Sequence, residues 1–131
     1  MEFSLEAIKK AQKLYTGPDF PKLVKEYRLM GIILNIYNIE TGVVNYINNS
    51  GDSIKDMGVK VDFEIPESSI YEKAILGLKR NQNGESDFMT FCTEVAQAGI
   101  YKWVVNLETM TCNYYDKNEN LIISEIIMSV E

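Results

Sequence analysis

Histidine is absent from this chain of 131 residues, and cysteine and proline are rare, with two and three residues. The missing histidine removes the usual general base at neutral pH, and with it the common Ser-His, Cys-His and His-metal arrangements. Cys92 and Cys112 match neither a zinc-site nor a CxxC redox spacing, and no glycine-rich phosphate loop is present. We therefore expect no metal and no cofactor, which favours a binding protein over an enzyme.

Long apolar runs and an excess of positive charge are also missing. Apolar stretches such as residues 122–128 are far shorter than a membrane span, and residues 1–6 lack the pattern of a secretory signal. The net charge of −6 argues against a nucleic-acid partner, because phosphate binding needs a basic patch. We expect a cytoplasmic protein with no membrane partner and with both cysteines as free thiols.

The composition that remains is that of a soluble globular protein, with 46% hydrophobic and 24% charged residues. The length suits a single compact domain spanning residues 1–131. Basic residues crowd the segment 9–28, and we interpret them as solvated helix faces rather than as a functional patch. They are Lys9, Lys10, Lys13, Lys22, Lys25 and Arg28.

An internal repeat is visible when the chain is aligned with itself so that Asp19 falls on Asp87 and Tyr46 on Tyr114. Ten of 28 ungapped positions are then identical, where average composition gives roughly two. The first members of these pairs are Asp19, Phe20, Glu26, Gly31, Ile32, Asn38, Glu40, Thr41, Asn45 and Tyr46. We infer a tandem duplication, with one copy in residues 1–66 and the other in residues 67–131. Residues that this alignment superimposes are called equivalent below.

Each copy begins with the pattern of two helices. Ser4 opens the first helix, and Ser69 followed by Glu72 has the spacing of a capping box. These first helices should end near Gly17 and Gly84. Matched Asp19 and Asp87 should cap the second helices. Matched Gly31 and Gly99 should close those helices with a left-handed residue.

Each copy continues with the pattern of three strands. The first two form a hairpin through Glu40-Thr41 or Glu108-Thr109, and in the second hairpin Trp103 should pair with Tyr114 and Val105 with Cys112. The third strands are predicted at residues 59–65 and 121–127. The fold class is therefore α+β: a tandem ααβββ repeat with pseudo-two-fold symmetry and an antiparallel sheet with helices on one face.

The two cysteines and the two turn glutamates are explained by structural roles in this predicted fold. Cys92 and Cys112 both point towards the core, where they act as small hydrophobic residues, with a reactive thiol as the less favoured alternative. Glu40 and Glu108 lie in matched turns, which explains them better than paired acid-base catalysis.

The sheet face opposite the core offers the candidate binding residues. Strand alternation places four asparagines there, Asn38, Asn45, Asn106 and Asn113, where they would form either a ligand surface or cross-strand amide pairs facing water. In the first copy the same face carries an apolar band suited to contact with another subunit, made of Leu34, Ile36, Val43 and Ile47. Near a strand end, Tyr114, Tyr115 and Asp116 are candidates for lining a pocket.

Residues 86–92 and 99–116 resemble the bacterial and prophage-borne proteins of unknown function labelled "phage envelope protein". The resemblance extends along the chain, and its most specific part is residues 102–116. It implies a phage or prophage origin and a small cytoplasmic product. It implies no activity, cofactor or catalytic residue.

Two hypotheses for function follow. The first is a non-enzymatic binding or assembly module that forms a homo-oligomer through the outer sheet face. The alternative is a small-molecule-binding protein, or an enzyme, with a site at the junction of the two copies, because a two-fold junction concentrates equivalent polar groups. The sequence leaves the ligand of such a site unknown.

Overall fold

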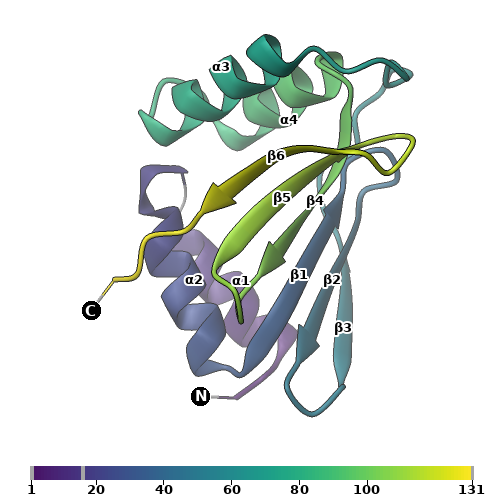
Figure 1. Cartoon of the computed structure of the whole chain (residues 1–131). Helices are drawn as coiled ribbons and strands as arrows, with labels where there is room; N and C mark the ends of the chain where they lie inside the picture. The colour runs from purple at the N-terminus through teal and green to yellow at the C-terminus, as the bar shows by residue number, and fades with distance from the viewer. Residues whose placement is uncertain (1, 16, 131) are drawn as a thin grey trace.

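A six-stranded antiparallel sheet with α-helices on one face forms the framework of the molecule (Figure 1). The computed structural model describes residues 2–15 and 17–130. The sheet order is β3-β2-β1-β4-β5-β6, so each half of the chain supplies three adjacent strands. The helices are α1 (Leu5–Leu14), α2 (Phe20–Leu29), α3 (Tyr71–Gln82) and α4 (Phe88–Gln97), with a short 3-10 turn η1 (Gly17–Asp19). The strands are β1 (Ile32–Asn38), β2 (Val43–Asn48), β3 (Ser53–Met57), β4 (Ile100–Asn106), β5 (Thr111–Asp116) and β6 (Leu121–Ile126).

The predicted α+β class and the antiparallel sheet are confirmed. In the hairpin of β4 and β5, Trp103 pairs with Tyr114 and Val105 with Cys112, as the sequence predicts. The two halves meet where β1 pairs antiparallel with β4, and Ile36 lies opposite Val104 at the middle of that pairing. This central pair holds both halves in one continuous sheet.

One predicted strand is wrong. Residues 59–65 form no strand; the third strand of the first half is β3, which lies earlier in the chain, at Ser53–Met57. The alternation of apolar residues at 59–65 reflects burial instead: Val61 and Ile65 are buried, and the Val61 N–H donates to the carbonyl oxygen of Ile39 at 3.0 Å. Burial and strand pairing leave the same period-two pattern in a sequence.

Helix starts agree with the sequence at two places and differ at two others. The Ser4 hydroxyl accepts from the Ala7 N–H at 3.1 Å, and the Asp87 carboxylate accepts from the Thr90 N–H at 2.8 Å. Asp19 precedes α2 without a capping hydrogen bond, because it lies in the turn η1 with a ψ of 12°, whereas the capping residue Asp87 is extended with a ψ of 175°. The predicted capping box at Ser69 is also wrong, because α3 begins after Ile70 and has no side-chain cap.

Both second helices end in a glycine of positive φ, as predicted. The φ angles are +80° at Gly31 and +97° at Gly99, and each glycine N–H donates to a carbonyl oxygen three residues back. These left-handed residues turn the chain directly from α2 into β1 and from α4 into β4. A tight exit of this kind brings each helix back over the sheet strand that follows it.

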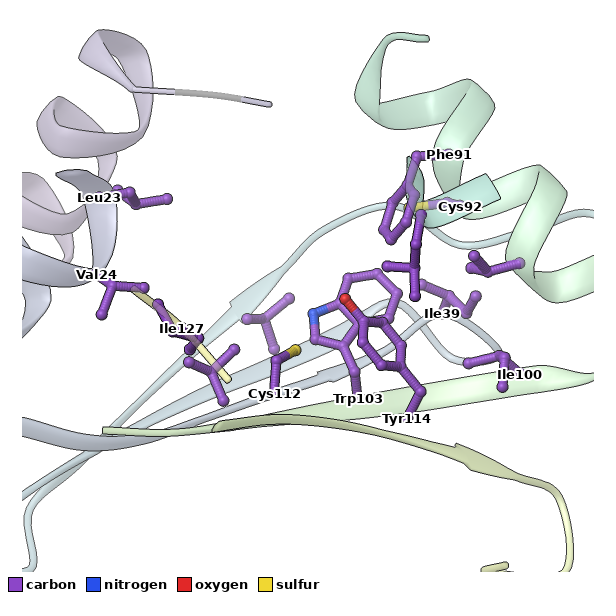
Figure 2. Packing of buried hydrophobic residues seen from close by; sticks show 14 of the residues in the cluster. Leu23, Val24, Ile39, Phe91, Cys92, Ile100, Trp103, Cys112, Tyr114 and Ile127 are labelled. Atoms are coloured by element: carbon purple, nitrogen blue, oxygen red, sulfur yellow. The ribbon is translucent and has the colours of Figure 1, made fainter. Parts of the chain in front are cut away.

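The core lies between the sheet and its helices. Figure 2 shows Leu23 and Val24 of α2 and Phe91 and Cys92 of α4 on the same side of the sheet. Trp103, Cys112 and Tyr114 cover the sheet beneath them, and the Trp103 ring packs on Phe91, Tyr114 and Tyr37. Among the described helices, none combines the length and apolar character needed to cross a membrane.

Candidate functional site

The sheet face that points away from the helices, which we call the outer face, carries most of the predicted binding residues. In the described part of the chain no helix lies over it (Figure 1). Its side chains come from alternate positions of all six strands. One row across the sheet, given by the strand register, reads Lys55, Asn45, Ile36, Val104, Asn113 and Ser124.

An apolar strip occupies the first half of the outer face and its centre. We define this strip as Leu34, Ile36, Val43, Ile47 and Val104, all of them partly exposed to solvent. Leu34 pairs with Ile47, and Ile36 pairs with Val104, so the side chains are cross-strand neighbours. Branched aliphatic residues normally pack under a second layer, and here the described chain provides none.

The second half of the outer face is polar and aromatic. Lys102 forms an ion pair with Glu119 at 2.7 Å, and its ammonium lies 5.4 Å and 5.3 Å from the ring centroids of Tyr101 and Tyr115. The Tyr101 hydroxyl also donates to Glu119. In the first half of the chain, the positions aligned with Tyr101 and Lys102 carry the apolar residues Ile33 and Leu34. The outer face is therefore asymmetric, with its apolar strip concentrated in the first half.

The four predicted asparagines lie on the outer face but do not form a cluster. Asn38 and Asn106 complete turns: their side-chain oxygens accept the N–H groups two and three residues later, at 2.9 and 3.0 Å for Asn38 and at 3.0 and 3.1 Å for Asn106. Asn113 accepts from the Ser124 hydroxyl and donates to Thr111. Asn45 lies between Ile36 and Lys55 in the row. Turn formation and cross-strand pairing explain three of the four amides.

Tyr114, Tyr115 and Asp116 are not brought together. Tyr114 is buried on the helix side of β5, and Tyr115 lies on the outer face beside Lys102. Asp116 is buried and closes the turn into β6, accepting from the N–H groups of Asn118 and Asn120 at 3.0 and 2.9 Å. Burial acts to raise the pKa of Asp116, but the hydrogen bonds from Asn120 and Asn118 outweigh it, and the pKa lies below its ordinary value.

The two cysteines are free and buried, as predicted. Burial raises the pKa of Cys92 to about 12 and the pKa of Cys112 to about 12. Both groups are therefore neutral thiols at physiological pH, in the apolar setting that Figure 2 shows. Over the described residues, no group of three or more cysteines and carboxylates is placed to hold a metal ion.

Two adjacent cavities lie at one end of the sheet. A site at the junction of the two copies was one of the hypotheses from the sequence, but none of the residues that line these cavities was assigned to it. The first, of about 300 Å³, is lined by Pro21, Lys25, Arg28, Leu29, Met110, Ser129 and Val130. The second, of about 220 Å³, shares Arg28 and adds Gly31, Ile32, Ile33, Asn49, Leu107 and Glu108. Both are lined by residues of the two halves of the chain. The only sequence signal was the excess of basic residues on the first two helices.

Comparison with known proteins identifies a family to which this sequence is similar. Its residues 7–126 match the model of a family described as "Protein of unknown function (DUF1398)". An uncharacterized protein of Mycobacterium tuberculosis (Rv2012, strain H37Rv) and one of Mycobacterium bovis (Mb2035) are each 28% identical to it over 98 residues. The match covers 73% of this chain and 59% of each relative, so the chain spans well under two thirds of their length.

Neither the family description nor the names of these relatives mention a phage or an envelope. They likewise state no activity, substrate or partner. The match to the family model extends from α1 to the end of β6 and so includes the helices and the sheet strands described above. The chain belongs to the DUF1398 family of proteins of unknown function.

Proposed function

We propose that this protein is a non-enzymatic assembly module that binds a second copy of itself through the outer face. The apolar strip is the observation that carries the proposal. Leu34, Ile36 and Val104 lie at the centre of the sheet, where aliphatic side chains gain most from a covering layer. A second sheet packed face to face would provide that layer at a spacing of about 10 Å.

The size of the outer face is sufficient for a specific dimer. Six strands about 4.8 Å apart and about six residues long span roughly 25 Å by 20 Å. Two such faces in contact bury at least about 1,000 Å², which is the lower limit for a specific interface. Because this estimate is a projected area, side-chain relief adds to it.

The distribution of charge favours one orientation of the second copy. Packing the first half of one copy on the first half of the other brings the two apolar strips together. It also leaves the ion pair of Lys102 and Glu119 near the rim, where its charges stay solvated. The opposite orientation would cover the apolar strip with Lys102 and Tyr115 of the second copy.

The proposal includes an internal duplication with a pseudo-two-fold axis between Ile36 and Val104. Support comes from hydrogen bonds that recur between equivalent residues of the two copies. The N–H of Ile39 donates to the Tyr101 carbonyl oxygen, and the N–H of Leu107 donates to that of Ile33, at 2.9 and 2.8 Å. These two bonds are reciprocal, as the contacts across a two-fold axis are.

The turns after β2 and β5 give further support for a duplication. The Asn48 side chain accepts from the N–H groups of Ser50 and Asp52, and Asp116 accepts from those of Asn118 and Asn120. Gly51 and Glu119, each three residues after the accepting side chain of its turn, both have a positive φ, of +85° and +64°. The phage origin and the cytoplasmic location stay predictions of the sequence.

Light scattering of purified protein at low micromolar concentration tests the proposal. We expect the wild type, with a chain mass of 15.0 kDa, to have twice that mass, and the Ile36→Asp variant to be monomeric. Leu76→Asp is the matched control, because Leu76 is 59% exposed on α3 and away from the outer face. Val43→Asp, nearer the edge of the sheet, serves if Ile36→Asp does not fold. A monomeric wild type at this concentration would refute self-association.

A further inference from the structure

The larger cavity is a groove between α2 and residues from the second half of the chain, and we call it the junction groove. Four of its lining residues belong to α2, and Met110, Ser129 and Val130 face them from the second half. Its volume of about 300 Å³ is at the lower end for small-molecule sites. Leu29, Met110 and Val130 make one part of the lining apolar.

The charge of the junction groove is positive. Lys25 and Arg28 lie three residues apart on α2, so their side chains share one face of the helix. Neither forms an ion pair with any residue that the structure describes. The one carboxylate among the lining residues of the adjoining cavity is Glu108, which does not line the groove. Among the described residues, the groove itself is lined by two cations and no acid.

The fold does not require these cations. The equivalent positions on α4 carry Thr93 and Ala96, and α4 packs on the sheet without a basic residue in its last turn. At the other end of the sheet, the counterparts of Glu108 and Asn49 are Glu40 and Lys117, which form an ion pair at 3.5 Å. At the junction groove, by contrast, Lys25 and Arg28 line a cavity and form no ion pair with the described residues.

Met110 provides an independent sign of function. It has a φ of +55°, a left-handed conformation that methionine adopts at an energetic cost. Gly42, at the same place in the first hairpin, has a φ of +83° and avoids that cost. The Met110 side chain lines the junction groove. Residues held in strained conformations cluster at binding sites, where the side chain is needed despite the strain.

We propose that the junction groove binds a small organic anion. Its acidic group lies between the Lys25 ammonium and the Arg28 guanidinium, and its apolar part lies on Leu29, Met110 and Val130. The groove is separate from the outer face, because α2 lies on the opposite side of the sheet (Figure 1).

Titration with sodium hexanoate, followed by backbone amide NMR, tests this site. We expect saturable shifts confined to α2, the turn at Met110 and residues 129–130, with little response to the neutral 1-hexanol. The double variant Lys25→Gln/Arg28→Gln should weaken hexanoate binding at least tenfold. Lys10→Gln/Lys13→Gln removes the same charge from α1, outside the groove, and should bind as the wild type does.

Met110→Gly separates the two parts of the site. It removes the strain and the apolar contact but leaves both cations, so hexanoate should bind several-fold more weakly while inorganic phosphate is unaffected. Equal weakening of hexanoate by both double variants would show that only net charge matters and would overturn the proposal. The absence of saturable shifts at millimolar hexanoate in the wild type would overturn it as well. The titration is repeated with Ile36→Asp, so that self-association does not influence the result.

Discussion

The glycines at the two helix exits, with Gly51 in the turn between β2 and β3 as a reference, allow a graded prediction of stability. Gly31, Gly51 and Gly99 all have a positive φ, so alanine at each is strained by about 1 kcal/mol. They differ in what a Cβ would meet. At Gly51 nothing lies within 4 Å, and at Gly31 the nearest atom is the Asn49 side-chain oxygen at 3.3 Å. At Gly99 the Ser68 carbonyl oxygen and the Ser69 Cα both lie at 2.8 Å.

The cost of each substitution follows from these distances. The exposed Asn49 side chain can move away, so Gly31→Ala should cost about as much as Gly51→Ala, about 1 kcal/mol. The backbone at residues 68–69 is held by the hydrogen bond from the Ile70 N–H to the Ala98 carbonyl oxygen, at 2.8 Å. Gly99→Ala therefore adds an overpacking cost of about 1–3 kcal/mol to the strain.

Thermal unfolding followed by circular dichroism measures these differences. For a chain of 131 residues, 1 kcal/mol corresponds to about 3–4 °C in the midpoint. We expect a loss of about 4 °C for Gly51→Ala and Gly31→Ala and of about 7–14 °C for Gly99→Ala. If Gly99→Ala is no worse than Gly51→Ala, residues 68–69 do not pack against the exit of α4, and the reasoning is refuted.

Three further predictions concern individual side chains. Asp87→Ala should lower the unfolding midpoint more than Asp19→Ala, because only Asp87 accepts a capping hydrogen bond; equal effects in thermal melts would contradict this. Asp116→Asn should be less stable than the wild type at pH 7, with a difference that narrows below about pH 4. The reason is that the pKa of Asp116 is lowered in the folded state, so its stabilisation is lost as the pH falls through that pKa; urea titrations at several pH values measure it. Cys92 and Cys112 should not react with Ellman's reagent before unfolding, and rapid labelling of either in native buffer would show an open thiol.

The sequence predicted the helices, the β4–β5 hairpin and the glycine exits because these depend on local patterns. Its errors arose where a neighbouring residue or a distant contact decided the structure. The turn η1 takes Asp19 out of the extended conformation that a capping residue needs. Three of the five residues of the edge strand β3 are polar, namely Ser53, Lys55 and Asp56, so its apolar alternation is too weak to indicate a strand. The buried segment at residues 59–65 has the stronger alternation of apolar residues and therefore predicts a strand that does not form.

Candidate sites were harder to predict than the fold. The placement of Leu34 and Ile36 on the outer face followed from strand alternation, which the structure confirms. The junction groove requires residues 129–130 to approach α2 across more than 100 positions in the chain. No local pattern contains that information, so the sequence alone indicates only ordinary solvated charges at Lys25 and Arg28.

The distance between spin labels on two copies tests face-to-face assembly most directly. A label on the Lys55→Cys variant reports only on distances between chains, because the native cysteines are buried. Sheets about 10 Å apart, packed first half on first half, predict a narrow distribution below about 30 Å in double electron–electron resonance. The same label on Leu76→Cys, on α3, should give a longer distance. A background signal alone from Lys55→Cys, or an equally short distance from Leu76→Cys, would contradict assembly through the outer face.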